Sequence, residues 1–376
     1  MNISLCRLSV CMCALAALLL LPLTGCGPKA DPGSSTTTTP ASADEAAEQS
    51  GEEAAAEPTA EAEEIQLVKA ELPADVERHL GPLMIPADNP MTPEKIALGK
   101  KLYFDKRLSK DGTISCATCH DPEMAWAEDE ATSTGIDEQV GPANSPTVIN
   151  SAYATSQFWD GRAATLEEQA LGPIENPIEM GHKLDDLVKE LAAIPEYEEA
   201  FQKVFGTAVT SDGIAKAIAA FERTVLSHNS PYDKFNDGDK DALDESQKRG
   251  LALFTDTGCA DCHTPPVFSN FRFYNAGVGM DKDPPDAGRM AVTKKDRDLG
   301  KIRVPMLREV AGTGPYFHDG SVETLEAAVE LMTAGGKDND NLSGMMKSMR
   351  DTEFSDQDKK DLVAFLNSLS GEFPKE

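Results

Sequence analysis

The sequence predicts an all-α protein of two domains with long loops, preceded by a disordered tether. The pentapeptide Cys-x-x-Cys-His occurs twice, at residues 116–120 and 259–263. A helical pattern of apolar residues precedes each copy, and the sustained alternation of a half-buried strand is nowhere evident. The 376 residues are enough for about two domains of ~100–200 residues each. We therefore expect one domain for each pentapeptide, at 72–235 and at 236–376.

Each pentapeptide has the residues that attach a c-type haem. Two thiols at this spacing reach both vinyl groups of one porphyrin, and the histidine that follows lies beneath the iron as its proximal ligand. A disulfide, a zinc site and a thioredoxin-like dithiol are the alternatives, but neither copy has the two further ligands that zinc needs. The pattern predicts two covalent haems, held by Cys116, Cys119, His120, Cys259, Cys262 and His263.

The beginning of the chain has the features of an export signal. Arg7 supplies the positive charge, and an apolar run at 14–21 is short for a transmembrane helix. The stretch 23–26, Leu-Thr-Gly-Cys, resembles a bacterial lipobox, which implies cleavage after residue 25 and lipidation of Cys26. An ordinary secretory peptide is the alternative. We expect residues 1–25 to be removed, and the protein to be lipid-anchored on the periplasmic side of a bacterial membrane.

Residues 26–71 predict a disordered tether. They are rich in Ser, Thr and Pro and then in Ala and Glu, so they cannot bury enough apolar surface to offset the entropy of ordering. The net charge of −29 argues against a nucleic-acid partner, whose phosphates it would repel. It suits a small basic electron carrier, although acidity also serves solubility alone.

Similar helices precede the two pentapeptides. The first spans about 92–104 and begins with Thr92 as N-cap and a proline at the first helical position. The second begins at Glu245, and the stretches 99–105 and 250–256 form a weak internal repeat. A helix directly before Cys-x-x-Cys-His is typical of the cytochrome c fold.

Further helical patterns lie between and after the pentapeptides. They cover about 184–194, 196–205 and 211–227, and an acidic stretch at 228–244 is expected to connect the domains. A last helix begins at Ser355, where Asp358 completes a pair like a capping box.

Several longer motifs accompany the pentapeptides. They are Gln-Phe-Trp-Asp-Gly-Arg at 157–162, the Glu-rich stretch 167–180, Arg-Val-Pro-Met-Leu-Arg at 303–308 and Gly-Pro-Tyr-Phe-His-Asp-Gly at 314–320. With these motifs the chain, from about residue 83 to 371, resembles the bacterial dihaem cytochrome c peroxidases and their MauG relatives. The resemblance implies two cytochrome c-like haem domains. It also implies that H2O2 is reduced to water at the first haem, with electrons from a small cytochrome c or cupredoxin entering through the second. Family members are often dimers, so a homodimer is expected.

The resemblance assigns roles to individual residues. Met332 matches the sixth ligand of the second haem, and a methionine there raises the reduction potential; core packing is the alternative. Glu179 matches the distal glutamate, which moves a proton between the peroxide oxygens, and Gln169 and Pro173 would line the same pocket. Trp159 matches the tryptophan between the haems. A surface glutamate and a core tryptophan are the plain alternatives.

Two further features concern metals and the distal side. Asn144, Thr313 and Pro315 match the family's Ca²⁺ ligands between the domains, the latter two through backbone carbonyls. Ile136 stands where many members have a distal histidine, and isoleucine cannot ligate iron. The hypothesis is a first haem with an open site already in the oxidised protein, unless His79 or His182 substitutes.

Two alternative functions remain at this point. One is MauG-like oxidation of a protein side chain, which the open distal side favours. Met332 argues against it, because MauG has tyrosine as the ligand of its second haem. The other is a dihaem electron carrier without a substrate, in which Glu179 and an open haem would be superfluous.

Overall fold

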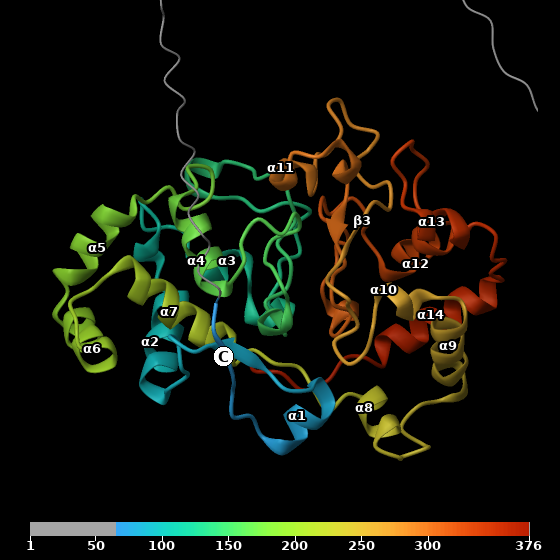
Figure 1. The fold of residues 1–376 in the computed structure, drawn as a ribbon, viewed down its shortest axis with the longest axis horizontal. Helices are drawn as coiled ribbons and strands as arrows, with labels where there is room; N and C mark the ends of the chain where they lie inside the picture. Colours follow the sequence, from blue (N-terminus) through green and yellow to red (C-terminus); the bar gives the residue numbers. More distant parts are fainter. Residues whose placement is uncertain (1–64, 376) are drawn as a thin grey trace, which may run out of the picture. The chain divides into compact units, whose positions relative to one another are not determined.

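The computed structural model describes residues 65–375, so the predicted signal peptide, Cys26 and most of the tether lie outside the described residues. The described residues form one compact unit. Its helices are α1 (Ala74–Leu80), α2 (Pro93–Tyr103), α3 (Cys116–Cys119), α4 (Leu166–Glu175), α5 (Leu184–Ala192), α6 (Pro195–Phe205), α7 (Ser211–Glu222), α8 (Pro231–Asn236), α9 (Glu245–Asp256), α10 (Cys259–Cys262), α11 (Met290–Thr293), α12 (Leu325–Thr333), α13 (Gly344–Met349) and α14 (Asp356–Asn367) (Figure 1). The prediction of an all-α fold is confirmed.

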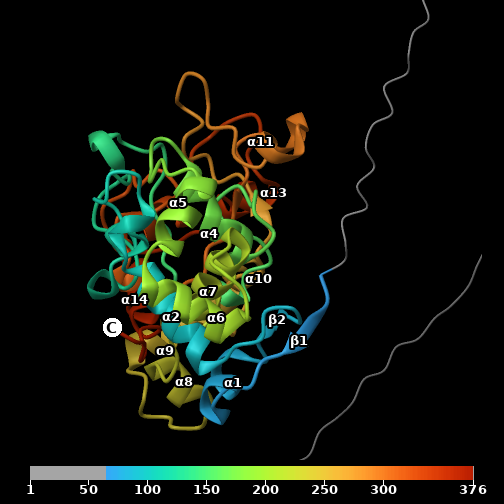
Figure 2. The same cartoon turned by 90° about the vertical axis from the view of Figure 1, so that its left-hand side faces the viewer.

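The strands are short and lie apart from the helical cores. β1 (Leu67–Lys69) pairs with β2 (Met84–Pro86), and β3 (Phe273–Tyr274) pairs with β4 (Ile302–Arg303), both antiparallel. Figure 2 shows the first pair beside α1, away from the stack of α2, α6 and α7. No helix within residues 65–375 is both long enough and apolar enough to cross a membrane.

Two lobes are built on the same crossing of two helices. The first lobe (93–226) packs α2 against α7, and the second lobe (245–370) packs α9 against α14. A Cβ atom on Gly99 would lie 1.9 Å from the carbonyl oxygen of Ala217, and one on Gly250 would lie 1.9 Å from that of Asp361. Both crossings therefore require glycine, which is the physical reason for the weak repeat in the sequence.

The correspondence between the lobes extends beyond this crossing. A tight turn is closed by the bridge between Gln157 and Ala163 in the first lobe and by the bridge between Tyr316 and Val322 in the second. Each turn contains a phenylalanine in the left-handed region, Phe158 with φ 65° and Phe317 with φ 69°. A threonine then caps the helix that packs on the crossing, Thr165 for α4 and Thr324 for α12. Counting from these caps, Pro173 occupies the position of Met332.

Each lobe has three packed aromatic rings in its core. They are Tyr103, Trp126 and Phe221 in the first lobe, and Phe254, Phe268 and Phe365 in the second. All six side chains are buried. The two cores are therefore alike in shape. Of these six aromatic side chains, only Tyr103 and Trp126 of the first lobe carry a polar group.

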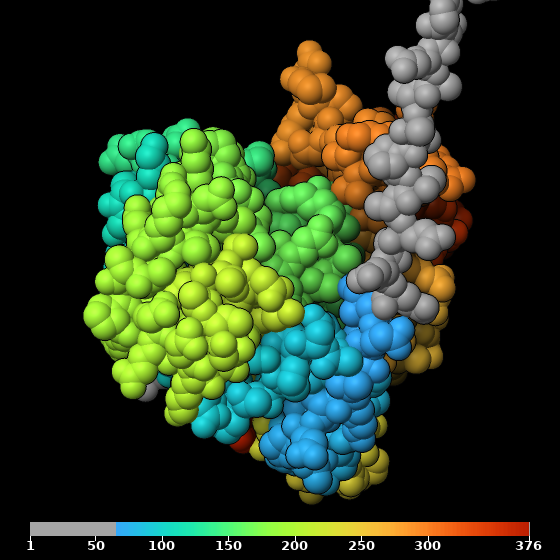
Figure 3. All heavy atoms as spheres, turned by 60° about the vertical axis from the view of Figure 1, so that its left-hand side comes forward, coloured from blue at the N-terminus to red at the C-terminus, as the bar shows by residue number. Residues whose placement is uncertain are grey.

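The segment between the lobes is more structured than its composition predicts. The stretch 228–244 contains helix α8, which begins at a capping box formed by Ser230 and Asp233. The predicted capping box of Ser355 and Asp358 at the start of α14 is confirmed. The orange projection at the top of Figure 3 belongs to the stretch between β3 and α11.

Candidate active site and haem attachment

The two attachment motifs form one-turn helices. In α3 and in α10 the cysteines are three residues apart, so both thiols lie on one side of a single turn. Ser115 and Thr118 form a capping box that begins α3. Cys116, Cys119, Cys259 and Cys262 are free thiols. Burial raises the pKa of the Cys119 thiol to about 11, so it is held in the neutral form.

The two histidines that follow are buried and neutral. Burial lowers the pKa of His120 and of His263 to about 4, and a neutral imidazole is the form that ligates a metal. The Nδ1 atom of His263 lies 3.2 Å from the carbonyl oxygen of Phe268, which leaves Nε2 for the iron. The Nδ1 atom of His120 has no hydrogen bond of regular geometry among the described residues.

Backbone carbonyls lie near both imidazole rings, although within residues 65–375 only His263 makes a carbonyl hydrogen bond of regular geometry through its Nδ1 atom. Those of Phe268 and Pro305 oppose the effect of burial on the pKa of His263, and those of Pro146 and Trp126 do so for His120. A carbonyl that holds the second ring nitrogen is the usual support of a metal-bound histidine. The free thiols, the neutral imidazoles and these carbonyls therefore fit one c-type haem in each lobe.

Glu179 lies in a cavity of the first lobe, on the loop that follows α4. The cavity has a volume of about 440 Å³, and Phe158, Arg162 and Asn176 also line it. Asn176 Nδ2 donates a hydrogen bond to Glu179 Oε1 over 2.7 Å. Burial raises the pKa of Glu179, while the Asn176 hydrogen bond and the charge of Arg162 lower it. The carboxyl group is thus held in place and can exchange a proton closer to neutral pH than an exposed glutamate.

Helix α4 turns a different face to this cavity from the one that the sequence indicated. The helix residues that line it are Glu168, Leu171, Gly172 and Glu175. Gln169 and Pro173 are half-buried on the neighbouring strip of the helix and do not line it. Their place beside Glu179 therefore stays a prediction.

Ile136 is buried and lies against the Glu179 loop. Its backbone N–H donates to the carbonyl of Glu179 over 2.8 Å. Its Cδ1 atom would lie 2.4 Å from a Cβ on Gly181, so the loop fits closely over its side chain. The two alternative histidines face carboxylates: His79 Nε2 lies 3.0 Å from Asp237, and His182 Nε2 lies 3.6 Å from Glu190.

Trp159 touches both lobes. Its indole Nε1 donates to the carbonyl of Asn144 over 2.8 Å, and its own carbonyl accepts from the N–H of Arg303, in the second lobe, over 2.9 Å. Its role between two haems stays a prediction. Met332 is half-buried on α12, which packs against α14.

The side-chain contacts of Asn144 and Thr313 use atoms other than the oxygens predicted to bind calcium. The Asn144 side chain donates to the carbonyl of Glu130 over 3.1 Å, and the Thr313 hydroxyl donates to that of Val310 over 3.3 Å. Pro315 lines a cavity of about 730 Å³ that neither Asn144 nor Thr313 lines. Calcium therefore stays a prediction.

A separate cluster of Asp286, His318 and Asp319 has metal-ligand chemistry. The ammonium of Lys282 already lies 2.8 Å from Asp286 and 3.3 Å from Asp319. The chain thus supplies its own cation to these carboxylates.

Some residues of the site could not be found from the motifs alone. Asn176 orients the glutamate through a contact within the same loop, and an asparagine three residues before a glutamate carries no distinctive signal. Trp126 and Phe268 face the proximal histidines from six and five residues downstream of them. An aromatic residue at this distance after each pentapeptide is the signal that would have indicated them.

The two lobes, each with an attachment motif and a buried proximal histidine, define a protein with two c-type haems. A family model described as Di-haem cytochrome c peroxidase matches residues 93–241, and the model Cytochrome c matches residues 247–370.

Individual relatives agree with these matches. Cytochrome c551 peroxidase of Nitrosomonas europaea is 43% identical over 77% of this chain and 84% of its own length. Methylamine utilization protein MauG of Methylorubrum extorquens is 39% identical over 76% of this chain and 81% of its own length. A solved structure of a MauG-like protein associated with microbial copper homeostasis has a TM-score of 0.70 and 32% identity, and covers 77% of this chain and 92% of its own. The chain belongs to the dihaem cytochrome c peroxidase family, and it is an enzyme of the peroxidase class.

Proposed function

We propose that the protein reduces H2O2 to two molecules of water at the first haem, with two electrons and two protons. The observation that carries this proposal is the difference between the lobes. A carboxyl group with a raised pKa stands in a cavity of the first lobe, while the equivalent helix of the second lobe carries Met332.

Glu179 is the proposed proton carrier. The haem supplies the redox chemistry when peroxide is bound. Glu179 takes a proton from one peroxide oxygen and delivers it to the other, which makes water the leaving group when the O–O bond breaks. Asn176 keeps one carboxylate oxygen fixed, so the other is free to face the substrate.

The second lobe is the proposed electron-accepting side. His263 and Met332 would hold the iron of the second haem, and the methionine would raise its potential, so that a small cytochrome c or cupredoxin can reduce it. Trp159, bonded to residues of both lobes, would carry electrons between the haems. Ile136 would leave the first haem open without prior reduction.

The location is also a proposal. The motif at 23–26 supports lipidation of Cys26 and attachment to a membrane on its periplasmic side, with the stretch from residue 27 to the start of β1 as the tether. The haems support it too, because c-type haem is attached outside the bacterial inner membrane. A homodimer and a calcium ion between the lobes remain expectations from the family.

Steady-state turnover tests the proposal. Purified holoprotein is mixed with H2O2 and reduced small cytochromes c or cupredoxins, and donor oxidation is followed optically. Two donor molecules oxidised for each peroxide consumed would support the proposal. Peroxide consumption without oxidation of any donor, together with a mass change in an added protein, would instead establish MauG-like oxidation of a side chain. The 39% identity to MauG and the isoleucine at 136 favour that second candidate.

A further inference from the structure

The segments that follow α7 and α14 each cross into the opposite lobe. After α7, the chain leads to Tyr232, whose ring packs against Phe268 with 5.1 Å between ring centroids. After α14, it leads to Phe373, which packs on the core of the first lobe. The next residue, Pro374, accepts a hydrogen bond from Trp126 Nε1 over 2.7 Å. Figure 1 shows the red segment after α14 returning towards α7.

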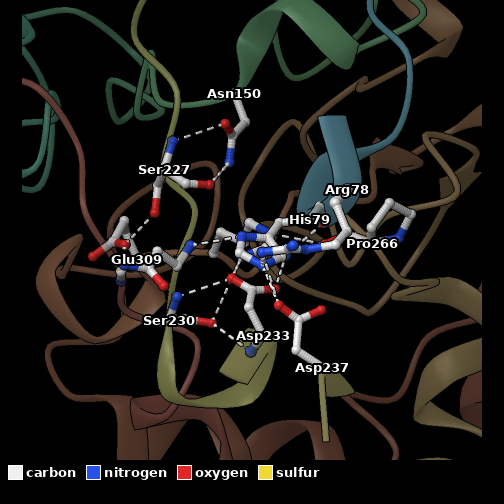
Figure 4. Close-up of polar contacts among 12 residues, drawn as sticks. Arg78, His79, Asn150, Ser227, Ser230, Asp233, Asp237, Pro266 and Glu309 are labelled. Carbon is white, nitrogen blue, oxygen red and sulfur yellow. Dashed lines mark hydrogen bonds and ion pairs between the residues drawn. The ribbon is translucent and has the colours of Figure 1, made fainter. Parts of the chain in front are cut away.

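The crossing point is nearly symmetric. His228 and Glu372 pair as an antiparallel bridge with backbone hydrogen bonds of 3.1 and 2.7 Å. The backbone N–H of Ser227 donates to Asn150 Oδ1 over 3.0 Å, and that of Gly371 donates to Glu309 Oε1 over 2.6 Å. Figure 4 shows Asn150 and Glu309 on opposite sides of Ser227. The two lobes therefore exchange equivalent segments.

A buried ion pair fixes the first of these segments. The two terminal guanidinium nitrogens of Arg308 donate to the Asp233 carboxylate, over 2.7 and 2.8 Å, and both side chains are buried. Arg308 also donates to the carbonyls of His79 and Pro266. A buried pair with these hydrogen bonds satisfied has a single well-defined geometry. It holds α8, and with it Tyr232, against the second lobe.

Each exchanged segment contacts one aromatic residue of the opposite lobe, Phe268 or Trp126, which lies near the proximal histidine of that lobe. Tyr232 touches Phe268, whose carbonyl accepts from His263 Nδ1 over 3.2 Å. Pro374 binds Trp126, the equivalent residue of the first lobe, whose carbonyl is near enough to His120 to oppose the effect of burial on its pKa. Phe268 and Trp126 have φ angles of 59° and 57°. Aromatic residues rarely adopt this left-handed conformation, and they keep it only where the surroundings hold them.

We infer that the exchanged segments are positioning elements for the proximal histidine of the opposite lobe: 371–374 act on His120 through Trp126, and Tyr232 acts on His263 through Phe268. This inference rests on the haem attachment in each lobe and not on the reaction with peroxide. It links the two haem sites on the proximal side.

Trp126→Phe tests the first half of the inference in the holoprotein. Phenylalanine already fills the equivalent position in the second lobe, and the change removes the N–H that binds Pro374. Phe373→Ala loosens the same segment at a half-buried position. A weaker hold on the carbonyl beside His120 makes the imidazole a poorer donor, which favours ferrous iron. We expect both variants to raise the potential of the first haem by up to about tenfold in the reduction equilibrium, about 59 mV for one electron.

Potentiometric titration followed optically reads both haems at once. The potential of the second haem should stay unchanged in these variants, and the double variant should shift the first no further than the larger single change. Tyr232→Ala should shift the second haem only. Phe201→Leu, in the first-lobe core but on α6, should lower thermal stability without moving either potential. If Trp126→Phe and Phe373→Ala lower stability and leave both potentials at the wild-type values, these residues are ordinary core and the inference is wrong.

Discussion

The two lobes have one scaffold and differ in a few side chains. The glycine-mediated helix crossing, the left-handed phenylalanine in the turn and the carbonyls around the proximal histidine occur in both. The two lobes differ in the residues of α4 and α12 and of the loops that follow these helices. Pro173 stands where the second lobe has Met332, and a loop with Glu179 follows α4, while Gly335 and Gly336 follow α12. The fold therefore supplies two haem sites, and the side chains opposite the histidines divide their work.

A second set of differences lies in the cores. Tyr103 hydroxyl donates to the His120 carbonyl over 3.3 Å, and the second lobe has Phe254 in its place. Glu222 is buried in the first lobe where the second has Leu366, and its Oε2 atom has no hydrogen-bond partner within residues 65–375. The first lobe thus buries more polar groups, and their effects can be measured against the apolar residues of the second.

The largest effect is expected at Glu179. Glu179→Gln keeps the shape and removes the proton transfer, so the rate of peroxide reduction should fall by about 10²–10⁴-fold. Stopped-flow mixing with H2O2 measures it, and the spectrum of the second haem should not change. The matched control is Glu175→Gln, which lines the same cavity and should retain the wild-type rate. A Glu179→Gln enzyme as fast as the wild type would remove the proposed distinction between the lobes.

Met332→Ala tests the other lobe. Loss of the thioether should lower the potential of the second haem by more than about 60 mV, tenfold or more in equilibrium, because the stabiliser of ferrous iron is gone. Redox titration measures the change. Met280→Ala and Met290→Ala serve as controls, since these methionines also follow the second attachment motif. If Met332→Ala has a normal potential and either control has a low one, the methionine changed in that control is the ligand and the assignment of Met332 is wrong.

The shared scaffold can be tested with matched glycines. Gly99→Ala and Gly250→Ala each drive a Cβ into a backbone carbonyl 1.9 Å away, so each should lower the free energy of unfolding by about 1–3 kcal/mol or more. Urea denaturation measures both. Gly344→Ala has open space around its Cβ and should change little. Markedly unequal losses at Gly99 and Gly250 would mean that the two crossings are not equivalent.

A smaller effect, dependent on pH, is expected from Glu222. Burial raises its pKa from 4.5 to about 8, with Arg223 opposing the shift and Glu167 adding to it. Between these values the folded state keeps a proton that the unfolded state releases, so this group reduces stability as pH rises, by up to about 1.4 kcal/mol per unit.

Glu222→Gln should remove this slope. Urea unfolding of the wild type and the variant at pH 5 and at pH 7.5 measures it, and the variant should gain stability relative to the wild type at the higher pH. Glu175→Gln, an exposed glutamate, should leave the slope in place. Parallel pH profiles for wild type and Glu222→Gln would show that this carboxyl group titrates normally.

Local features were predictable from the sequence because they depend on near neighbours. The Cys-x-x-Cys-His motifs, the cap at Thr92 and the capping box at Ser355 each lie within a few residues. The repeat at Gly99 and Gly250 was also visible, because a close helix crossing restricts single positions. Glu179 was found through a family resemblance, not from its spacing.

What could not be predicted depends on contacts across the chain. Trp126 and Pro374 are 248 residues apart, and nothing local to either indicates the hydrogen bond between them. The orientation of α4, which turns Glu168 rather than Gln169 to the cavity, is decided by packing on α7. The polar composition of α8 predicts a connecting segment. The buried pair of Asp233 with Arg308 cannot be predicted from it, because the two residues are far apart in the sequence.

The most direct test of the unequal lobes is the EPR spectrum of the fully oxidised holoprotein, followed by that of the half-reduced form. We predict one high-spin ferric haem, with an open site above His120, and one low-spin haem with His263 and Met332 as ligands. One electron per protein should remove the low-spin signal and leave the high-spin signal. Two low-spin haems in the oxidised protein would contradict the account, because a sixth ligand would then close the first site in spite of Ile136.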